Sequence, residues 1–140
     1  MDVVVERRIA WGVLALLLVY AIIVVIIPYS QNNLQSVDTP GHLVSAQYVR
    51  DVLWPSPIGW DHRFFGGHPL NQFYGPLLSW IVALLGKFIE LSVAFKLVMA
   101  VAVLATPLSI YYCARSASMR PLAAALASAL IFGLMAARHN

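Results

Sequence analysis

One stretch near the amino terminus constrains this chain more than any other: residues 9–27 carry no charged side chain and are almost entirely apolar. A helix of this length crosses a bilayer, because each residue adds about 1.5 Å and the hydrocarbon core is about 30 Å thick. The stretch follows Glu6-Arg7-Arg8 and ends at Pro28. We expect an uncleaved transmembrane helix. The alternative is a signal peptide, whose apolar region is usually shorter.

The composition of the whole chain also favours a membrane protein. Hydrophobic residues make up 61% of it and charged residues 11%, whereas soluble domains have about 45–50% and about 25%. The net charge is +3, but Lys and Arg stand mostly at the ends of apolar stretches, where they set the topology. No basic stripe interleaved with aromatic residues is present, so we expect the lipid bilayer as a partner and no nucleic acid.

Two later stretches complete the expected topology. Residues 91–112 are charged only at Lys96, and residues 121–137 are apolar. The positive-inside rule places Arg7 and Arg8 in the cytoplasm, together with the turn 113–120. The sequence therefore predicts an all-α, multi-pass protein of the plasma membrane with three transmembrane helices, a cytoplasmic amino terminus and a large extracytoplasmic loop over 28–90. If 74–89 also crosses, the protein has four spans.

The long loop is expected to contain two helices that lie in the membrane interface, over 40–53 and 74–89. In the first, Thr39 is a suitable N-cap and Pro40 a suitable first residue. One face of that helix is apolar, and Trp54-Pro55 ends it. The apolar face consists of Val44, Tyr48, Val49 and Val52.

The same loop holds nearly all the side chains that could carry chemistry. Asp38 and His42 are four residues apart, a spacing that places them on one face of a helix. Asp61 and His68 follow, and Tyr74 stands beyond them. Carboxylates and imidazoles serve as general bases or as ligands for a divalent cation, so Asp38 and His42 are also candidate ligands for Mg²⁺ or Mn²⁺.

Plainer interpretations stand beside these. Asp38 precedes the expected helix, where a carboxylate favours the helix dipole, and His42 fits a polar residue of the membrane interface better than a ligand. The Gly66-Gly67 pair is typical of a turn. It lacks the Lys and Ser/Thr of a phosphate-binding P-loop, and no strand is expected before it.

The order of short motifs resembles a known superfamily. The motifs are Asp38-Thr39-Pro40-Gly41-His42, Trp54-Pro55, Gly59-Trp60-Asp61, Phe65-Gly66-Gly67-His68-Pro69-Leu70, Phe73-Tyr74-Gly75-Pro76-Leu77 and Ala94-Phe95-Lys96-Leu97. Together they resemble the amino-terminal segment of the GT-C superfamily of polytopic membrane glycosyltransferases. The resemblance is closer to the "6-pyruvoyl-tetrahydropterin synthase-related" (YfhO-like) membrane domain family. His68 and Gly75 depart from the family's usual residues, and no residue pattern for pterin binding is present.

The resemblance implies transfer of a sugar from a polyprenyl-phosphate donor on the outer face of the membrane. Asp38 then corresponds to the acidic residue that is expected to be the catalytic base or metal-binding group, and a divalent cation is a possible cofactor. His42, Asp61, His68 and Tyr74 become candidates for substrate binding. The expected helices 40–53 and 74–89 would border the cavity.

Such enzymes have many more transmembrane helices than this chain provides. We therefore expect residues 1–140 to be one membrane domain of a longer chain, or to need further membrane helices or a partner chain, and to be inactive alone. The alternative function is a non-catalytic membrane subunit or scaffold.

Overall fold

The structure, a computed structural model, describes residues 2–31, 38–63, 65–73 and 75–137. Helices dominate it, and the only strands among the described residues form one small hairpin. The chain divides into two compact units, Met1–Gln31 with Ala100–Asn140, and Asn32–Met99. We call them the helical unit and the loop unit and describe each separately.

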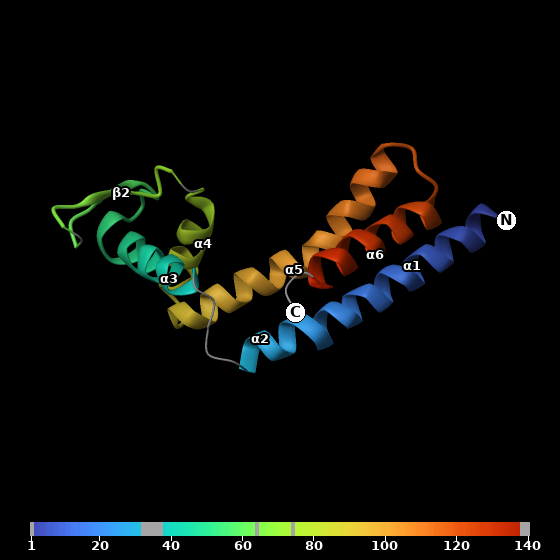
Figure 1. Cartoon of the computed structure of the whole chain (residues 1–140), viewed down its shortest axis with the longest axis horizontal. Helices are drawn as coiled ribbons and strands as arrows, with labels where there is room; N and C mark the ends of the chain where they lie inside the picture. Colours follow the sequence, from blue (N-terminus) through green and yellow to red (C-terminus); the bar gives the residue numbers. More distant parts are fainter. Residues whose placement is uncertain (1, 32–37, 64, 74, 138–140) are drawn as a thin grey trace. The chain divides into compact units, whose positions relative to one another are not determined.

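The helical unit contains α1 (Val3–Tyr20), which continues through the π-helical segment η1 (Ala21–Ile26) into α2 (Ile27–Gln31). It also contains the second part of α5 (Leu91–Ser116) and all of α6 (Pro121–Ala137). Figure 1 shows α1, in blue, alongside α6, in red. Asp2 caps α1 by accepting a hydrogen bond from the Val4 N–H at 3.1 Å.

Small side chains let these helices approach closely. Ala10 of α1 is completely buried with Ala124 and Ala125 of α6, beside Leu14 and Tyr111. Close approach through small residues is how helices pack where lipid, and not water, surrounds them.

Two polar contacts also join the helices of this unit. The Ser128 hydroxyl donates to the Pro107 carbonyl at 2.6 Å, joining α6 to α5. The Glu6 carboxylate accepts from the Leu122 N–H at the start of α6. The Leu122 N–H belongs to the first turn of α6, where backbone N–H groups have no acceptor within the helix.

Within the described residues, two helices are long and apolar enough to cross a membrane. They are Val3–Gln31 and Leu91–Ser116, which contain the first two expected spans. The third expected span, 121–137, is a helix whose apolar part, Pro121–Met135, is shorter. The protein is therefore mostly helical with two candidate spans, and the three-span topology stays a prediction.

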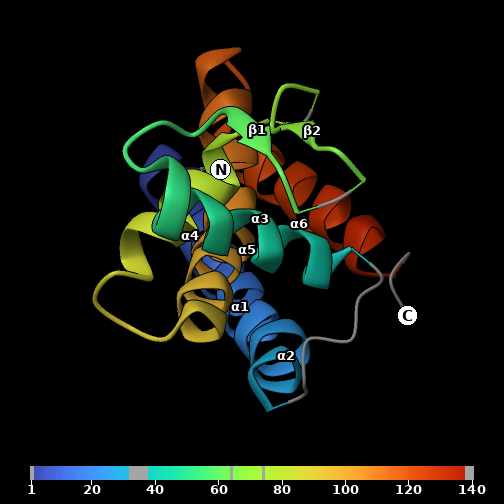
Figure 2. The same cartoon turned by 90° about the vertical axis from the view of Figure 1, so that its left-hand side faces the viewer.

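The loop unit is built around α3 (Thr39–Tyr48) and its π-helical continuation η2 (Val49–Leu53). It also contains the strands β1 (Gly59–Asp61) and β2 (His68–Leu70), the helix α4 (Leu77–Leu85) and the start of α5. Helix α3 packs on α4, and Figure 2 shows the hairpin beside them. Tyr48, Val49, Leu70 and Ala83 form the core of the unit.

The helix expected over 40–53 is present, with corrections at its start and along its apolar face. Asp38 occupies the N-cap position and Thr39 is the first helical residue, so Thr39 is not the cap. Tyr48 and Val49 are buried, whereas Val44 and Val52 of the same arc are 37% and 60% exposed. The helix expected over 74–89 is α4, which is shorter because Gly86 follows its last turn.

The antiparallel hairpin of β1 and β2 is a feature that the sequence did not predict. Gly59 pairs with Leu70, Trp60 with Pro69, and Asp61 with His68. A strand therefore does precede the Gly66-Gly67 pair, contrary to expectation, and the two glycines lie in the turn with φ of 93° and 100°. A Cβ atom on Gly67 would overlap the Trp60 indole. Both the limited space and the backbone conformation at this position therefore favour glycine.

Candidate functional site

A groove of about 630 Å³ opens in the loop unit, between the start of α3 and the β2 side of the hairpin. Helix α3 contributes one wall, and β2 with the segment leading to α4 contributes the other. Six of the described residues that line it are polar: Asp38, His42, Ser45, His68, Asn71 and Ser79. Three of the residues singled out from the sequence, Asp38, His42 and His68, therefore come together on one concave surface.

Asp38 lies at the entrance to α3 and is exposed. Its backbone carbonyl accepts from the His42 N–H at 3.1 Å, but its side chain makes no capping hydrogen bond to the helix. An N-cap aspartate normally uses its carboxylate for that bond. The Asp38 carboxylate is therefore left available to a molecule in the groove.

His42 is one turn further along α3, and its ring is stacked on Phe95 of α5. The ring centroids are 6.4 Å apart and the ring planes differ by 24°. Phe95 is only 3% exposed. The His42 ring therefore lines the groove and also contacts a buried aromatic ring.

His68 begins β2 and is half-buried. It reaches the groove because the hairpin brings β2 close to α3, although His68 lies far from His42 in the sequence. Sequence spacing alone does not give this proximity, since it depends on the hairpin.

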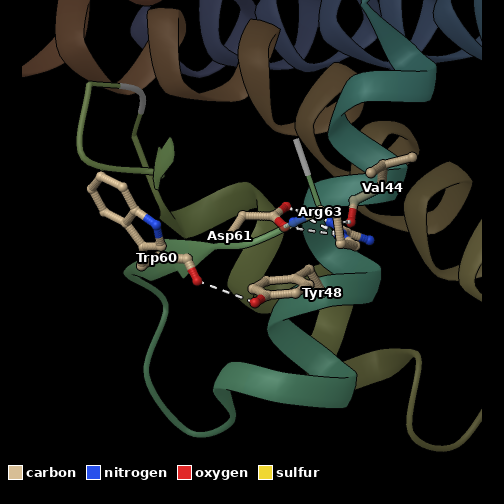
Figure 3. Close-up of polar contacts among 5 residues, drawn as sticks. All are labelled: Val44, Tyr48, Trp60, Asp61 and Arg63. Atoms are coloured by element: carbon tan, nitrogen blue, oxygen red, sulfur yellow. Dashed lines mark hydrogen bonds and ion pairs between the residues drawn. The ribbon is translucent and has the colours of Figure 1, made fainter. Parts of the chain in front are cut away.

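Asp61 was expected to bind substrate, but it does not line the groove. Its side chain is completely buried and is held by Arg63. The Arg63 backbone N–H donates to the Asp61 carboxylate at 3.0 Å. The Arg63 guanidinium donates to it at 2.9 Å from Nε and at 2.6 Å from the terminal nitrogen (Figure 3). These hydrogen bonds place Asp61 in a structural ion pair.

The ion pair changes the pKa of both Asp61 and Arg63. Hydrogen bonds from the Arg63 side chain hold the pKa of Asp61 below its ordinary value, even though burial opposes this. The same pairing raises the pKa of Arg63. Both groups are therefore charged at neutral pH, and Asp61 is unsuited to accept a proton in catalysis.

Tyr74, the remaining candidate, lies outside the described residues. Three groove residues were not singled out from the sequence: Ser45, Asn71 and Ser79. Ser45 follows His42 by three residues, so helical spacing could have placed it on the same face. Asn71 has φ of 58°, and its side-chain amide donates to the Pro57 carbonyl at 2.9 Å. No sequence signal identifies this contact.

A divalent cation does not fit the described residues by themselves. Among them, no cluster of three or more His, Cys, Asp and Glu side chains could hold a metal ion. Mg²⁺ prefers oxygen ligands, and on the described lining of the groove Asp38 is the one carboxylate. The described lining does not by itself supply the ligands of a divalent cation, and a metal cofactor stays a prediction.

Comparison with known proteins returned no relative. No protein-family model, no curated protein and no solved structure matches this chain.

Proposed function

We propose that this chain is part of a membrane glycosyltransferase of the GT-C type, and that the groove of the loop unit is its transfer site. The observation that carries the proposal is the convergence of Asp38, His42 and His68 on one groove. The groove belongs to a unit from which α5, a candidate span, begins. The motifs that resemble the superfamily supply the same three residues.

The chemistry we propose is nucleophilic displacement at a sugar carbon. Asp38 accepts the proton of an acceptor hydroxyl while the hydroxyl oxygen forms a bond to the anomeric carbon. The bond from that carbon to the phosphate oxygen of the donor breaks, and polyprenyl phosphate leaves with the bonding electrons. General-base assistance of this kind contributes about 10²–10⁴-fold to a rate. His42 and His68 would donate hydrogen bonds to the sugar or the departing phosphate.

This function requires the groove to face the outer side of the plasma membrane. We propose three spans, α1–α2, α5 and α6, with Arg7 and Arg8 in the cytoplasm. Cysteines placed singly at Ser56 and Ser118, in a chain whose own Cys113 is changed to Ser, test this arrangement by labelling with a membrane-impermeant maleimide. Only the cysteine at position 56 is expected to react in intact cells.

The test of the catalytic proposal is a substitution of Asp38 by Asn in the longest natural form of the protein. The protein is reconstituted in vesicles and supplied with polyprenyl-phosphate sugars and candidate acceptors. We expect Asp38→Asn to lower the transfer rate by about 100-fold or more. Asp51→Asn is the matched control, because Asp51 is an exposed carboxylate of the same unit that pairs with Arg50 outside the groove.

A non-catalytic membrane subunit is the second candidate, favoured by the position of Asp38 immediately before α3. If the carboxylate only favours the helix dipole, its loss costs less than about 1 kcal/mol of local stability. Equal transfer by the wild type, Asp38→Asn and Asp51→Asn would therefore reject the catalytic role and support the subunit.

A further inference from the structure

The Asp61–Arg63 pair does more than neutralise a buried charge. Asp61 ends β1, and its carboxylate is the anchor for the Arg63 guanidinium (Figure 3). The Arg63 side chain is 37% exposed, whereas the Asp61 side chain is fully enclosed. The ion pair therefore lies at the turn end of the hairpin, with its carboxylate buried.

Arg63 also contacts helix α3 at two residues that are one turn apart. Its terminal nitrogen donates to the Val44 carbonyl at 3.3 Å, and its guanidinium carbon lies 4.3 Å from the centre of the Tyr48 ring. Tyr48 completes the link in the other direction, because its hydroxyl donates to the Trp60 carbonyl at 3.1 Å. Hairpin and helix are thus joined by three contacts that involve two side chains, as Figure 3 shows.

The joined segments are those that carry the groove. Asp61 is the register partner of His68 across the hairpin, so whatever fixes Asp61 also fixes the strand position of His68. On α3, Ser45 lies between Val44 and Tyr48 in the sequence, and His42 precedes Val44 by two residues. The contacts of Arg63 therefore set the separation between the groove wall that carries His68 and the wall that carries His42.

We propose that Asp61 and Arg63 are positioning residues, which hold His68 at its place in the groove opposite Asp38 and His42. The proposal rests on the proposed function only in treating the groove as the transfer site. It gives Asp61 a role different from substrate binding: the carboxylate acts through Arg63 and the hairpin, without touching the substrate.

The molecule provides a matched control in a second Arg–Asp pair. Arg50 donates to Asp51 at 2.7 Å, and both side chains are partly exposed. Arg50 also donates to the Gly86 carbonyl at 3.3 Å, so it too joins two segments of the loop unit. Neither residue lines the groove. We therefore expect Arg50→Ala to remove a comparable contact and to leave the position of His68 unchanged.

The experiment compares Arg63→Ala, Arg63→Lys and Arg50→Ala with the wild type, each as the full chain in lipid nanodiscs. Imidazole signals are recorded by NMR with labelled histidine and assigned through His42→Gln and His68→Gln. We expect Arg63→Ala to shift the His68 signal, Arg63→Lys to shift it less, and Arg50→Ala to leave it unchanged. An unchanged His68 signal in Arg63→Ala, or the same shift in Arg50→Ala, would overturn the proposal.

Transfer kinetics provide a second readout. Because an error of about 1 Å in placement can cost about 10²-fold in rate, we expect Arg63→Ala to lower kcat by 10-fold or more while KM changes less. A kcat equal to that of Arg50→Ala would contradict the positioning role. If Arg63→Ala does not fold, Arg63→Lys and Asp61→Asn decide by the same two readouts. If the wild type transfers no sugar, the proposed function fails, and the histidine signals still decide the positioning role.

Discussion

Different kinds of contact stabilise the two units of this protein internally. In the helical unit, buried alanines allow α1 and α6 to touch, and only a few polar side chains take part. In the loop unit, polar side chains make the connections between segments: Arg63 joins the hairpin to α3, and Asn71 joins two parts of the hairpin. Trp80 adds another by donating to the Pro55 carbonyl at 3.0 Å.

The difference shows where function can reside. A helix contact made of alanines depends on shape and offers no group that binds or reacts. A unit made of short segments has a small apolar core, so it depends on directional contacts, which also orient the side chains around a groove. The groove with Asp38, His42 and His68 lies in the second kind of unit.

The largest expected effect comes from overfilling the alanine contact. Ala125 is completely buried between α1 and α6, and Ala125→Leu adds side-chain volume where the helices touch. We expect a loss of about 1–3 kcal/mol, seen as faster hydrogen exchange in α1 and α6 with the loop unit unchanged. Leu130→Ala, at a position that is 64% exposed, is the control. Equal protection of α1 and α6 in Ala125→Leu and the wild type would show that the contact does not hold this unit together.

The next effect is expected at the hairpin turn. Gly67→Ala places a methyl group on the Trp60 indole and forces a residue with a side chain to adopt φ near 100°. Conformation alone costs about 1–2 kcal/mol. Gly66→Ala carries only that cost, because nothing lies within 4 Å of its Cβ position. We expect hairpin amides to exchange faster in Gly67→Ala than in Gly66→Ala. The same rate in both variants would argue against the close approach of Trp60.

A smaller effect is expected from Tyr48→Phe. The change removes the hydrogen bond to the Trp60 carbonyl but keeps the ring beneath Arg63. A hydrogen bond contributes about 0.5–1.5 kcal/mol. The free energy of opening for amides of the hairpin should therefore fall by about that amount, and their hydrogen exchange should be faster. Tyr112→Phe, at an exposed position of the helical unit, should change nothing. A hairpin as protected as in the wild type would remove Tyr48 from the link.

Acid should have the smallest effect, and only in the loop unit. Since the pKa of Asp61 is lowered by Arg63, its ionisation stabilises the fold above the ordinary value of about 3.9, and this contribution is lost as the pH falls through the lower folded value. The protonated side chain still accepts a hydrogen bond, which limits the loss. Fluorotryptophan signals report both units, through Trp60 and Trp11. We expect acid to shift the first signal, and Asp61→Asn to weaken that shift. A shift of equal size in Asp61→Asn would assign it to another group.

Sequence reasoning predicted the long helices better than the short segments. Long apolar stretches, with no charge over 9–27 and one over 91–112, sufficed for α1 and α5, because composition over many residues determines such helices. The two strands were not predicted from the sequence, because each has only three residues and one contains Pro69. The i, i+4 spacing correctly grouped Asp38 with His42, since both belong to the start of α3. It could not place Asp61, because adjacent residues of a loop point in directions that only the hairpin and Arg63 determine.

The two glycines of the hairpin turn have a consequence for the gene. Any change in the first or second base of a glycine codon introduces either a residue with a β-carbon or a stop codon. At position 66 only the backbone resists such a residue, whereas at position 67 the Trp60 indole resists it as well. Among one-base neighbours, aspartate tolerates positive φ best. Natural variants of this turn should therefore accumulate at codon 66 before codon 67, and a loss of glycine at 67 should be accompanied by a smaller residue at position 60.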